Sequence, residues 1–269
     1  MKGASFPLLA GLGLLAAIAL LATAGAWLIP TAPGATDARA LQPPSPAHPF
    51  GTDDLGRDVL SGVLHGGRVS LIVGMVAALT SALVGVAVGL VAGYRGGLVD
   101  DLLMRLTELV QTVPRFFLAV LVAALFGPSF LALTFLLGLT FWPQTARLLR
   151  SQVLSLRERE FVLAARALGC SDLRIIRAHL LPNAVAIAVT SAALQVGAAI
   201  LVEAGLAFLG VGDRSVVSWG RMLNDAQPFL RLAWWMSVFP GVALAATVLG
   251  ANLLADGLYR AWDPRARRR

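Results

Sequence analysis

Long apolar runs are the feature of this sequence that most constrains its fold. They lie near residues 6–29, 70–93, 103–126, 129–149, 184–211 and 232–256. Each run reaches the roughly 20 residues that a helix needs to cross a bilayer. With 57% hydrophobic and 14% charged residues, the chain is also more apolar than a soluble core of this length requires. The pattern predicts an all-α polytopic membrane protein with six transmembrane helices in one domain.

The arginines are distributed unevenly between the two sides of this predicted bundle. Only Arg39, Arg57, Arg68, Arg214, Arg221 and Arg231 fall on the side away from the N-terminus. The N-terminal side holds Lys2, Arg95, Arg105, Arg147, Arg150, Arg157, Arg159, Arg166, Arg174, Arg177, Arg260, Arg265, Arg267, Arg268 and Arg269. The positive-inside rule therefore predicts a multi-pass protein of the inner, cytoplasmic membrane with both termini in the cytoplasm. Attraction to anionic membrane lipid explains the net charge of +7 better than nucleic-acid binding does, because no basic face is interleaved with aromatic residues.

The first apolar run has a second interpretation. Lys2, the long apolar stretch and the small residues Ala22, Ala24 and Ala26 also fit a cleavable signal peptide. We favour a retained helix, because the stretch continues through residues 27–29 without a polar break. Cys170 is the only cysteine, so the chain forms no internal disulfide.

Residues 155–183, here called the knob, form a charged island with helical patterning between two apolar runs. Ser155 and Glu158 are spaced as a capping box, and Phe161, Ala164, Ala165 and Leu168 recur at helical spacing. Gly169 stands where a helix would stop, a second short helix follows Ser171, and Pro182 is expected to end it. The sequence predicts two short helices joined at a glycine, too short and too charged to span a bilayer.

The knob resembles the "EAA" signature of permeases in ABC importers. Ala164-Ala165, Gly169 and Leu181-Pro182 hold the spacing of the signature, and Glu160 lies near its acidic position, which falls on Leu163. The resemblance implies a type I importer permease fold with a cytoplasmic coupling helix that contacts an ATPase. The residues that it implies for this contact are Glu160, Phe161, Ala164, Ala165, Arg166, Leu168, Gly169, Asp172, Leu181 and Pro182.

A second motif narrows the resemblance. The segment HPFGTDDLGRD from His48 is similar to a periplasmic signature of the C-type permeases of dipeptide, oligopeptide, nickel and glutathione importers. GYRGGLVDDLLMRLTEL from Gly93 and VEAGLAFLGVG from Val202 extend the similarity over nearly the whole chain. We expect a short interfacial helix through Leu55–Leu64, capped by Thr52 or Asp53. For Asp53, Asp54 and Asp58 we favour capping and solvation over calcium binding.

These motifs divide the chain into regions. We expect an N-terminal transmembrane helix at 1–30, a periplasmic loop at 31–69, a core permease domain at 70–260 that includes the knob, and a basic tail at 261–269. In the second span Ala77, Ser81, Gly85, Gly89 and Gly93 recur every four residues, which favours close helix packing.

Polar residues inside the predicted spans are costly, so each requires a role. Arg115, Gln195, Glu203 and Asn252 are candidates for lining a translocation pathway, although interhelical pairing or capping is the more common role for such residues. Asp101–Arg105 and Arg105–Glu108 have the spacing of ion pairs within one helix, and Glu108 and Arg115 would share a face two turns apart. Pro114 is expected to kink this helix.

The sequence contains no means of hydrolysing ATP. Lys2 is its only lysine, so no phosphate-binding loop of the G-x-x-x-x-G-K-[ST] type is present. The resemblance implies a non-catalytic permease subunit without its own cofactor, a homologous second permease, two ATPase subunits that bind ATP and Mg, and a periplasmic or lipid-anchored binding protein. Short peptides are the expected substrate; nickel, a metallophore or a glutathione-like molecule is the alternative.

Overall fold

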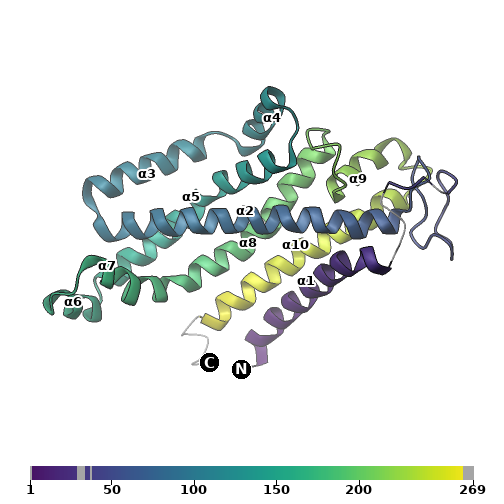
Figure 1. Cartoon of the computed structure of the whole chain (residues 1–269). Coiled ribbons are helices and arrows are strands. Elements are labelled where there is room, and N and C mark those ends of the chain that lie inside the picture. The colour runs from purple at the N-terminus through teal and green to yellow at the C-terminus, as the bar shows by residue number, and fades with distance from the viewer. Residues whose placement is uncertain (1, 29–33, 37, 263–269) are drawn as a thin grey trace.

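The computed structural model describes residues 2–28, 34–36 and 38–262, and every regular element in them is a helix (Figure 1). The predicted basic tail lies outside these residues from position 263 onward. The helices are α1 Lys2–Leu28, α2 Val59–Arg95, α3 Gly97–Thr112, α4 Arg115–Phe126, α5 Phe130–Arg157, α6 Glu160–Ala167, α7 Asp172–Ile175, the π-helical η1 Ile176–Leu180, α8 Leu181–Phe208, α9 Trp219–Ala226, the 3-10 turn η2 Gln227–Phe229 and α10 Trp235–Trp262.

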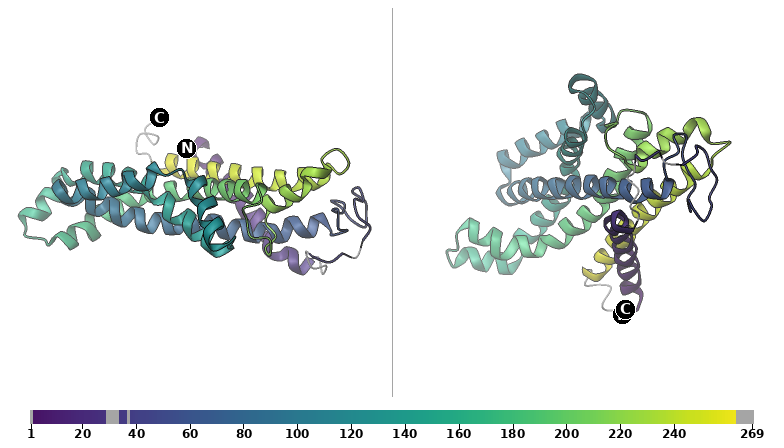
Figure 2. Two further views of the ribbon diagram at one scale, coloured as in Figure 1. Left: turned by 90° about the horizontal axis from the view of Figure 1, so that it is seen from above. Right: turned by 45° about the vertical axis from the view of Figure 1, so that its right-hand side comes forward.

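The long helices form one elongated bundle with two different ends (Figure 2). The knob lies at one end, called here the knob end. The opposite end, called here the loop end, consists of residues 38–58 and α9. The start of α1 and the end of α10 lie side by side, because Gly11 packs on the backbone of Leu254 and Gly257 packs on that of Leu8.

The all-α membrane fold is confirmed, with four or five helices that meet the requirements for a span. In the described residues α1, α2, α10 and the continuous segment from Asp172 to Phe208 are long and apolar enough to cross a bilayer. The pair α3 and α4 adds a fifth span if it is counted as one bent element. The fourth predicted span, residues 129–149, corresponds to α5, whose 28 residues are long enough but whose second half carries Gln144, Arg147 and Arg150.

Pro114 breaks the third span as expected. It stands at the N-cap of α4, and the axes of α3 and α4 differ by 72°. Because proline cannot donate a backbone hydrogen bond, the helix stops there and restarts in a new direction. Glu108 and Arg115 therefore do not share one helix face, which corrects the prediction made from their spacing.

The predicted small-residue stripe packs α2 against α5. A Cβ on Gly85 would lie 2.6 Å from Cβ of Thr145, and one on Gly89 would lie 2.7 Å from the carbonyl oxygen of Ala146. Neither position has room for a larger side chain, since real Cβ atoms do not approach so closely. The second and fourth predicted spans thus form the central pair of the bundle.

The segment before α2 differs from the prediction. The expected short interfacial helix is absent as a separate element, because its residues from Val59 onward form the first turns of the 37-residue α2. Asp58, rather than Thr52 or Asp53, caps this helix by accepting a hydrogen bond from the Ser61 amide at 2.8 Å. The boundary expected at residues 69 and 70 therefore falls inside α2.

Candidate functional site

The knob forms from two short helices and a glycine turn. The α6 helix ends in a Schellman motif, in which the Gly169 amide donates to the Arg166 carbonyl at 2.9 Å and the Cys170 amide donates to the Ala165 carbonyl at 3.0 Å. Gly169 has φ +74°, a left-handed conformation in which a residue with a Cβ is strained. The predicted glycine stop between two helices is therefore confirmed.

Two details of the predicted knob are wrong. Ser155 lies inside α5, which continues to Arg157, so no capping box forms with Glu158; Arg159 stands at the N-cap of α6 without a side-chain hydrogen bond. Pro182 does not end a helix. It occupies the first turn of α8, where a missing N–H costs little, and the π-helical residues 176–180 join α7 to α8.

One side of the knob is anchored in an apolar core. Val162, Ala165, Ile175 and Leu180 are buried in a cluster with residues of α2, α5 and α8: Leu90, Tyr94, Leu149, Val153, Leu156, Ala184 and Ala188. Burying several large side chains here stabilises the knob against the bundle. Of the predicted coupling residues, Ala165 belongs to this buried side, and Leu181 is half-buried.

The other side of the knob presents apolar side chains at the surface. Leu168 is 84% exposed, Leu163 is 47% exposed and Phe161 is 42% exposed. The predicted coupling residues that are exposed are Glu160, Phe161, Ala164, Arg166, Leu168, Gly169, Asp172 and Pro182. Apolar side chains grouped at the tip of a projecting helix pair are typical of a docking surface, because exposure of such groups to water is unfavourable.

Polar contacts fix the neighbouring ends of α2 and α3. The guanidinium of Arg150 donates two hydrogen bonds to the carboxylate of Asp100, at 2.5 and 2.6 Å. Arg157 donates to the Gly93 carbonyl at 3.1 Å, and Arg147 lies 3.9 Å from Glu108. Asp100 and Glu108 of α3 therefore pair with α5, and none of the ion pairs found among the described residues is of the kind predicted within α3.

The polar candidates in the spans occupy four different environments. Arg115 lines a groove of about 670 Å³ with Gln111 and Phe116, donates to the Thr140 carbonyl at 3.1 Å and stacks 4.2 Å from the ring centre of Phe141. Gln195 is buried between α5 and α8, where it donates to the Thr145 hydroxyl at 2.6 Å. Its contacts are those of interhelical pairing.

Glu203 and Asn252 also lie apart from each other. Glu203 lines a small cavity with Thr134 of α5 and Ser218 before α9, and its Oε2 atom is buried without a hydrogen-bond partner among the described residues. Asn252 is exposed on α10. Among the described residues, the four candidates do not line one cavity, and a pathway role remains a prediction for each.

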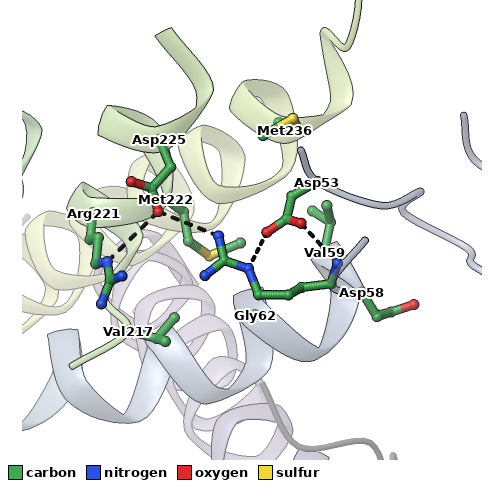
Figure 3. Close-up of a pocket in the computed structure, with 10 residues that line it drawn as sticks. Asp53, Asp58, Val59, Gly62, Val217, Arg221, Met222, Asp225 and Met236 are labelled. Carbon is green, nitrogen blue, oxygen red and sulfur yellow. Dashed lines mark hydrogen bonds and ion pairs between the residues drawn. The ribbon is translucent and has the colours of Figure 1, made fainter. Parts of the chain in front are cut away.

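The loop end holds the second motif in a network of polar contacts (Figure 3). His48 Nδ1 lies 2.9 Å from the carboxylate of Asp58, the N-cap of α2, and Asp53 accepts hydrogen bonds from the amides of Leu55 and Arg57 in the turn before that helix. The carboxylate of Asp225 on α9 lies 3.7 Å from Arg57 and 3.7 Å from Arg221. Burial raises the pKa of Asp225, and the two arginines oppose that shift.

Sequence reasoning missed Tyr94 and the pairing of Asp100 with Arg150. Both Tyr94 and Asp100 lie in the GYRGGLVDD segment that carried the resemblance, but neither partner is near in sequence. The Asp100 and Arg150 pair joins positions 50 residues apart, a contact that no local spacing indicates.

Comparison with known proteins agrees with this arrangement. Residues 85–268 match the model of the family described as "Binding-protein-dependent transport system inner membrane component". A dipeptide transport system permease of Bacillus subtilis is 40% identical over 84% of this chain and 71% of its own length. The corresponding permease of Alkalihalophilus pseudofirmus is 39% identical over 84% of this chain and 74% of its own length. A putative peptide transport system permease of Brucella suis is 38% identical over 95% of this chain and 86% of its own length.

The fold has a counterpart among solved structures. The inward-facing methionine ABC transporter MetNI matches with a TM-score of 0.61 at 19% identity, over 74% of this chain and 95% of the matched one. The helical bundle is thus that of a type I importer permease. This chain belongs to the family of inner-membrane components of binding-protein-dependent transport systems.

Proposed function

We propose that this chain is a permease subunit of an ATP-driven importer, and that it forms the translocation pathway for short peptides together with a homologous second permease. The observation that carries the proposal is the two-sided knob. Its buried side is fixed to α2, α5 and α8, while Phe161, Leu163 and Leu168 remain exposed to a partner. The curated relatives named for dipeptides and peptides favour peptides over nickel, a metallophore or glutathione.

Energy must then come from two ATPase subunits, which bind ATP and Mg. The knob would lie in an apolar groove of an ATPase, as amphipathic helices do in many complexes. The ATP-bound and nucleotide-free forms of the ATPase pair would hold the two knobs at different separations. This difference in binding shifts the permease between its inward- and outward-open states. This chain contributes no catalytic step, and a periplasmic or lipid-anchored binding protein delivers the peptide.

The arginine distribution favours a cytoplasmic knob with cytoplasmic termini. In this orientation the loop end faces the binding protein. A cysteine at Ser45 should react with an impermeant thiol reagent added to intact cells, whereas the native Cys170 should not react. Labelling of Cys170 from outside would contradict the orientation.

Reconstitution of the four-subunit complex in liposomes tests the function. With the binding protein and a labelled dipeptide present, uptake should require ATP, this chain and an intact ATPase. The control omits this chain but keeps the second permease. ATP-dependent uptake of the dipeptide that persists without this chain would contradict the proposal. So would a complex that takes up nickel and is stimulated by nickel in its ATPase activity, but does neither with peptide.

A further inference from the structure

Tyr94 connects the last turn of α2 to the knob. Its side chain is only 6% exposed, and its hydroxyl donates a hydrogen bond to Oδ1 of Asp172 at 2.7 Å. Asp172 is the first residue of α7, and 78 positions separate the two partners in sequence. A buried hydroxyl that bonds to a carboxylate is a stronger link than an ordinary neutral hydrogen bond.

The same ring touches the other knob helix. The guanidinium of Arg166, on α6, lies 5.3 Å from the centre of the Tyr94 ring, a distance typical of a cation–π contact. Tyr94 also belongs to the apolar cluster that holds Val162 and Ile175. A single side chain of α2 therefore contacts both short helices of the knob.

The backbone next to Tyr94 is held rigidly. Arg157 donates to the carbonyl of Gly93, and a Cβ on Gly93 would lie 2.8 Å from Cβ of Val153. A few residues later, Asp100 accepts both hydrogen bonds from Arg150. The end of α2 and the start of α3 therefore form one unit with α5, and Tyr94 reaches from this unit to the knob.

Tyr94 supplies polar links from α2 to both knob helices. Its hydroxyl bonds to Asp172 of α7, and the guanidinium of Arg166 on α6 lies against its ring. The apolar cluster adds further contacts between these helices and α2. Apolar surfaces can slide with little penalty, whereas a hydrogen bond to a carboxylate requires a defined geometry and is lost when its partners separate. The contacts of Tyr94 thus join both knob helices to the end of α2.

We propose that Tyr94 is a positioning residue that transmits movement of the knob to the α2–α3 corner. The inference rests on the proposed function, since it assumes that an ATPase displaces the knob. Without the hydroxyl, the knob would still bind the ATPase through its exposed side. Less of the knob's movement would then reach α2. ATP hydrolysis would continue, but fewer peptides would be transported per ATP.

The test is Tyr94→Phe in the reconstituted complex, with Tyr259→Phe as the matched control. The phenylalanine keeps the ring beside Arg166 and removes only the hydroxyl. Tyr259, the other tyrosine, is exposed on α10. We expect peptides transported per ATP to fall about fivefold in Tyr94→Phe, as for the loss of one hydrogen bond. ATPase co-purification and thermal stability should stay near wild type, and Tyr259→Phe should change nothing.

Asp172→Ala and the double variant Tyr94→Phe/Asp172→Ala complete a double-mutant cycle. If the pair acts as a unit, the double variant should lose no more coupling than Tyr94→Phe alone. If peptides transported per ATP are unchanged in Tyr94→Phe while the wild-type complex is active, the proposed role of Tyr94 is overturned and the proposed function is not. A parallel loss of assembly, hydrolysis and uptake would also overturn that role, because that outcome is a purely structural defect. Absence of ATP-dependent peptide uptake in the wild-type complex would instead contradict the proposed function.

Discussion

At the loop end, hydrogen bonds of buried polar groups hold neighbouring segments together, whereas at the knob end most contacts between segments are apolar. Thr52 is fully buried, donates to the Arg39 carbonyl at 2.7 Å and accepts from the Gln42 amide at 2.8 Å. Trp235 and Trp219 donate their indole N–H groups to the carbonyls of Thr52 and Val63. In the described part of the knob, hydrogen bonds to α2 are made by Asp172, which accepts from Tyr94, and by Arg157, which donates to the Gly93 carbonyl, and most other contacts there are apolar.

The difference agrees with the proposed movement of the knob, because the two kinds of contact respond differently to displacement. Directional bonds hold a single geometry, so the loop end is a rigid platform that ties α2 to α9 and α10. Apolar contacts tolerate small displacements, and exposed apolar side chains remain for a partner. A coupling segment needs both properties, because it must follow another subunit without unfolding.

The largest expected effect comes from Gly169→Val. Valine at φ +74° costs on the order of 1–2 kcal/mol, because its Cβ collides with the backbone in the left-handed region. We expect recruitment of the ATPase and uptake to fall about tenfold while membrane insertion stays normal. Co-purification and uptake assays measure both effects.

Two controls make this result specific. Gly169→Asn should be milder, because asparagine tolerates the left-handed conformation. Gly13→Ala places a methyl group in open space on α1 and should be neutral. Full recruitment and uptake by Gly169→Val would remove the knob from the coupling mechanism.

Thr52→Val should weaken the loop end without affecting coupling. The valine keeps the shape but leaves the Gln42 amide and the Arg39 carbonyl without their partner, at a cost of about 1–3 kcal/mol. We expect a lower unfolding midpoint and faster proteolysis of residues 38–58, with peptides transported per ATP unchanged. Thr112→Val, which removes a hydrogen bond at an exposed position, is the control. If Thr52→Val lowered ATPase recruitment and uptake as much as Gly169→Val does, the two ends would not differ in their role in transport.

The smallest effect is a pH dependence at the turn before α9. Hydrogen bonds from the Ser215 hydroxyl and amide lower the pKa of Asp213 below its ordinary value. A carboxyl whose pKa is lower in the folded state stabilises the fold above its unfolded pKa. This stabilisation is lost as pH falls through the folded value. The protection factors of the Ser215 and Phe130 amides, which correct for the intrinsic pH dependence of hydrogen exchange, should therefore fall in acid, and Asp213→Asn should abolish that change. Protection factors that depend equally on pH in the variant would contradict this prediction.

Local patterns in the sequence predicted the elements with local causes. The apolar runs indicated the spanning helices, Gly169 indicated the turn in the knob, Pro114 indicated the break, and the small-residue stripe indicated the face of α2 that packs on α5. Each depends on backbone conformation or side-chain size within a few residues of the position concerned.

The errors arose where tertiary packing outweighs local preference. The S-x-x-E pattern at Ser155 predicts a helix start, but burial of Val153 and Leu156 continues α5 past it. Glu108 lies beside Arg147 of α5 instead of pairing with Arg105 in its own helix, because α5 lies alongside α3. Sequence spacing holds no information about such neighbours, and this is also why Tyr94 was missed.

The most direct test places a photoreactive amino acid at each end of the molecule. Leu168 is 84% exposed at the knob and Leu55 is 56% exposed at the loop end, so both positions accept a probe without disturbing the core. In the assembled transporter the account predicts crosslinking of the Leu168 probe to an ATPase subunit, at a yield that changes between the ATP-bound and nucleotide-free states. The Leu55 probe should not reach the ATPase. Crosslinking of the ATPase from Leu55, or none from Leu168 in a complex that transports peptide, would contradict the assignment of the knob as the coupling surface.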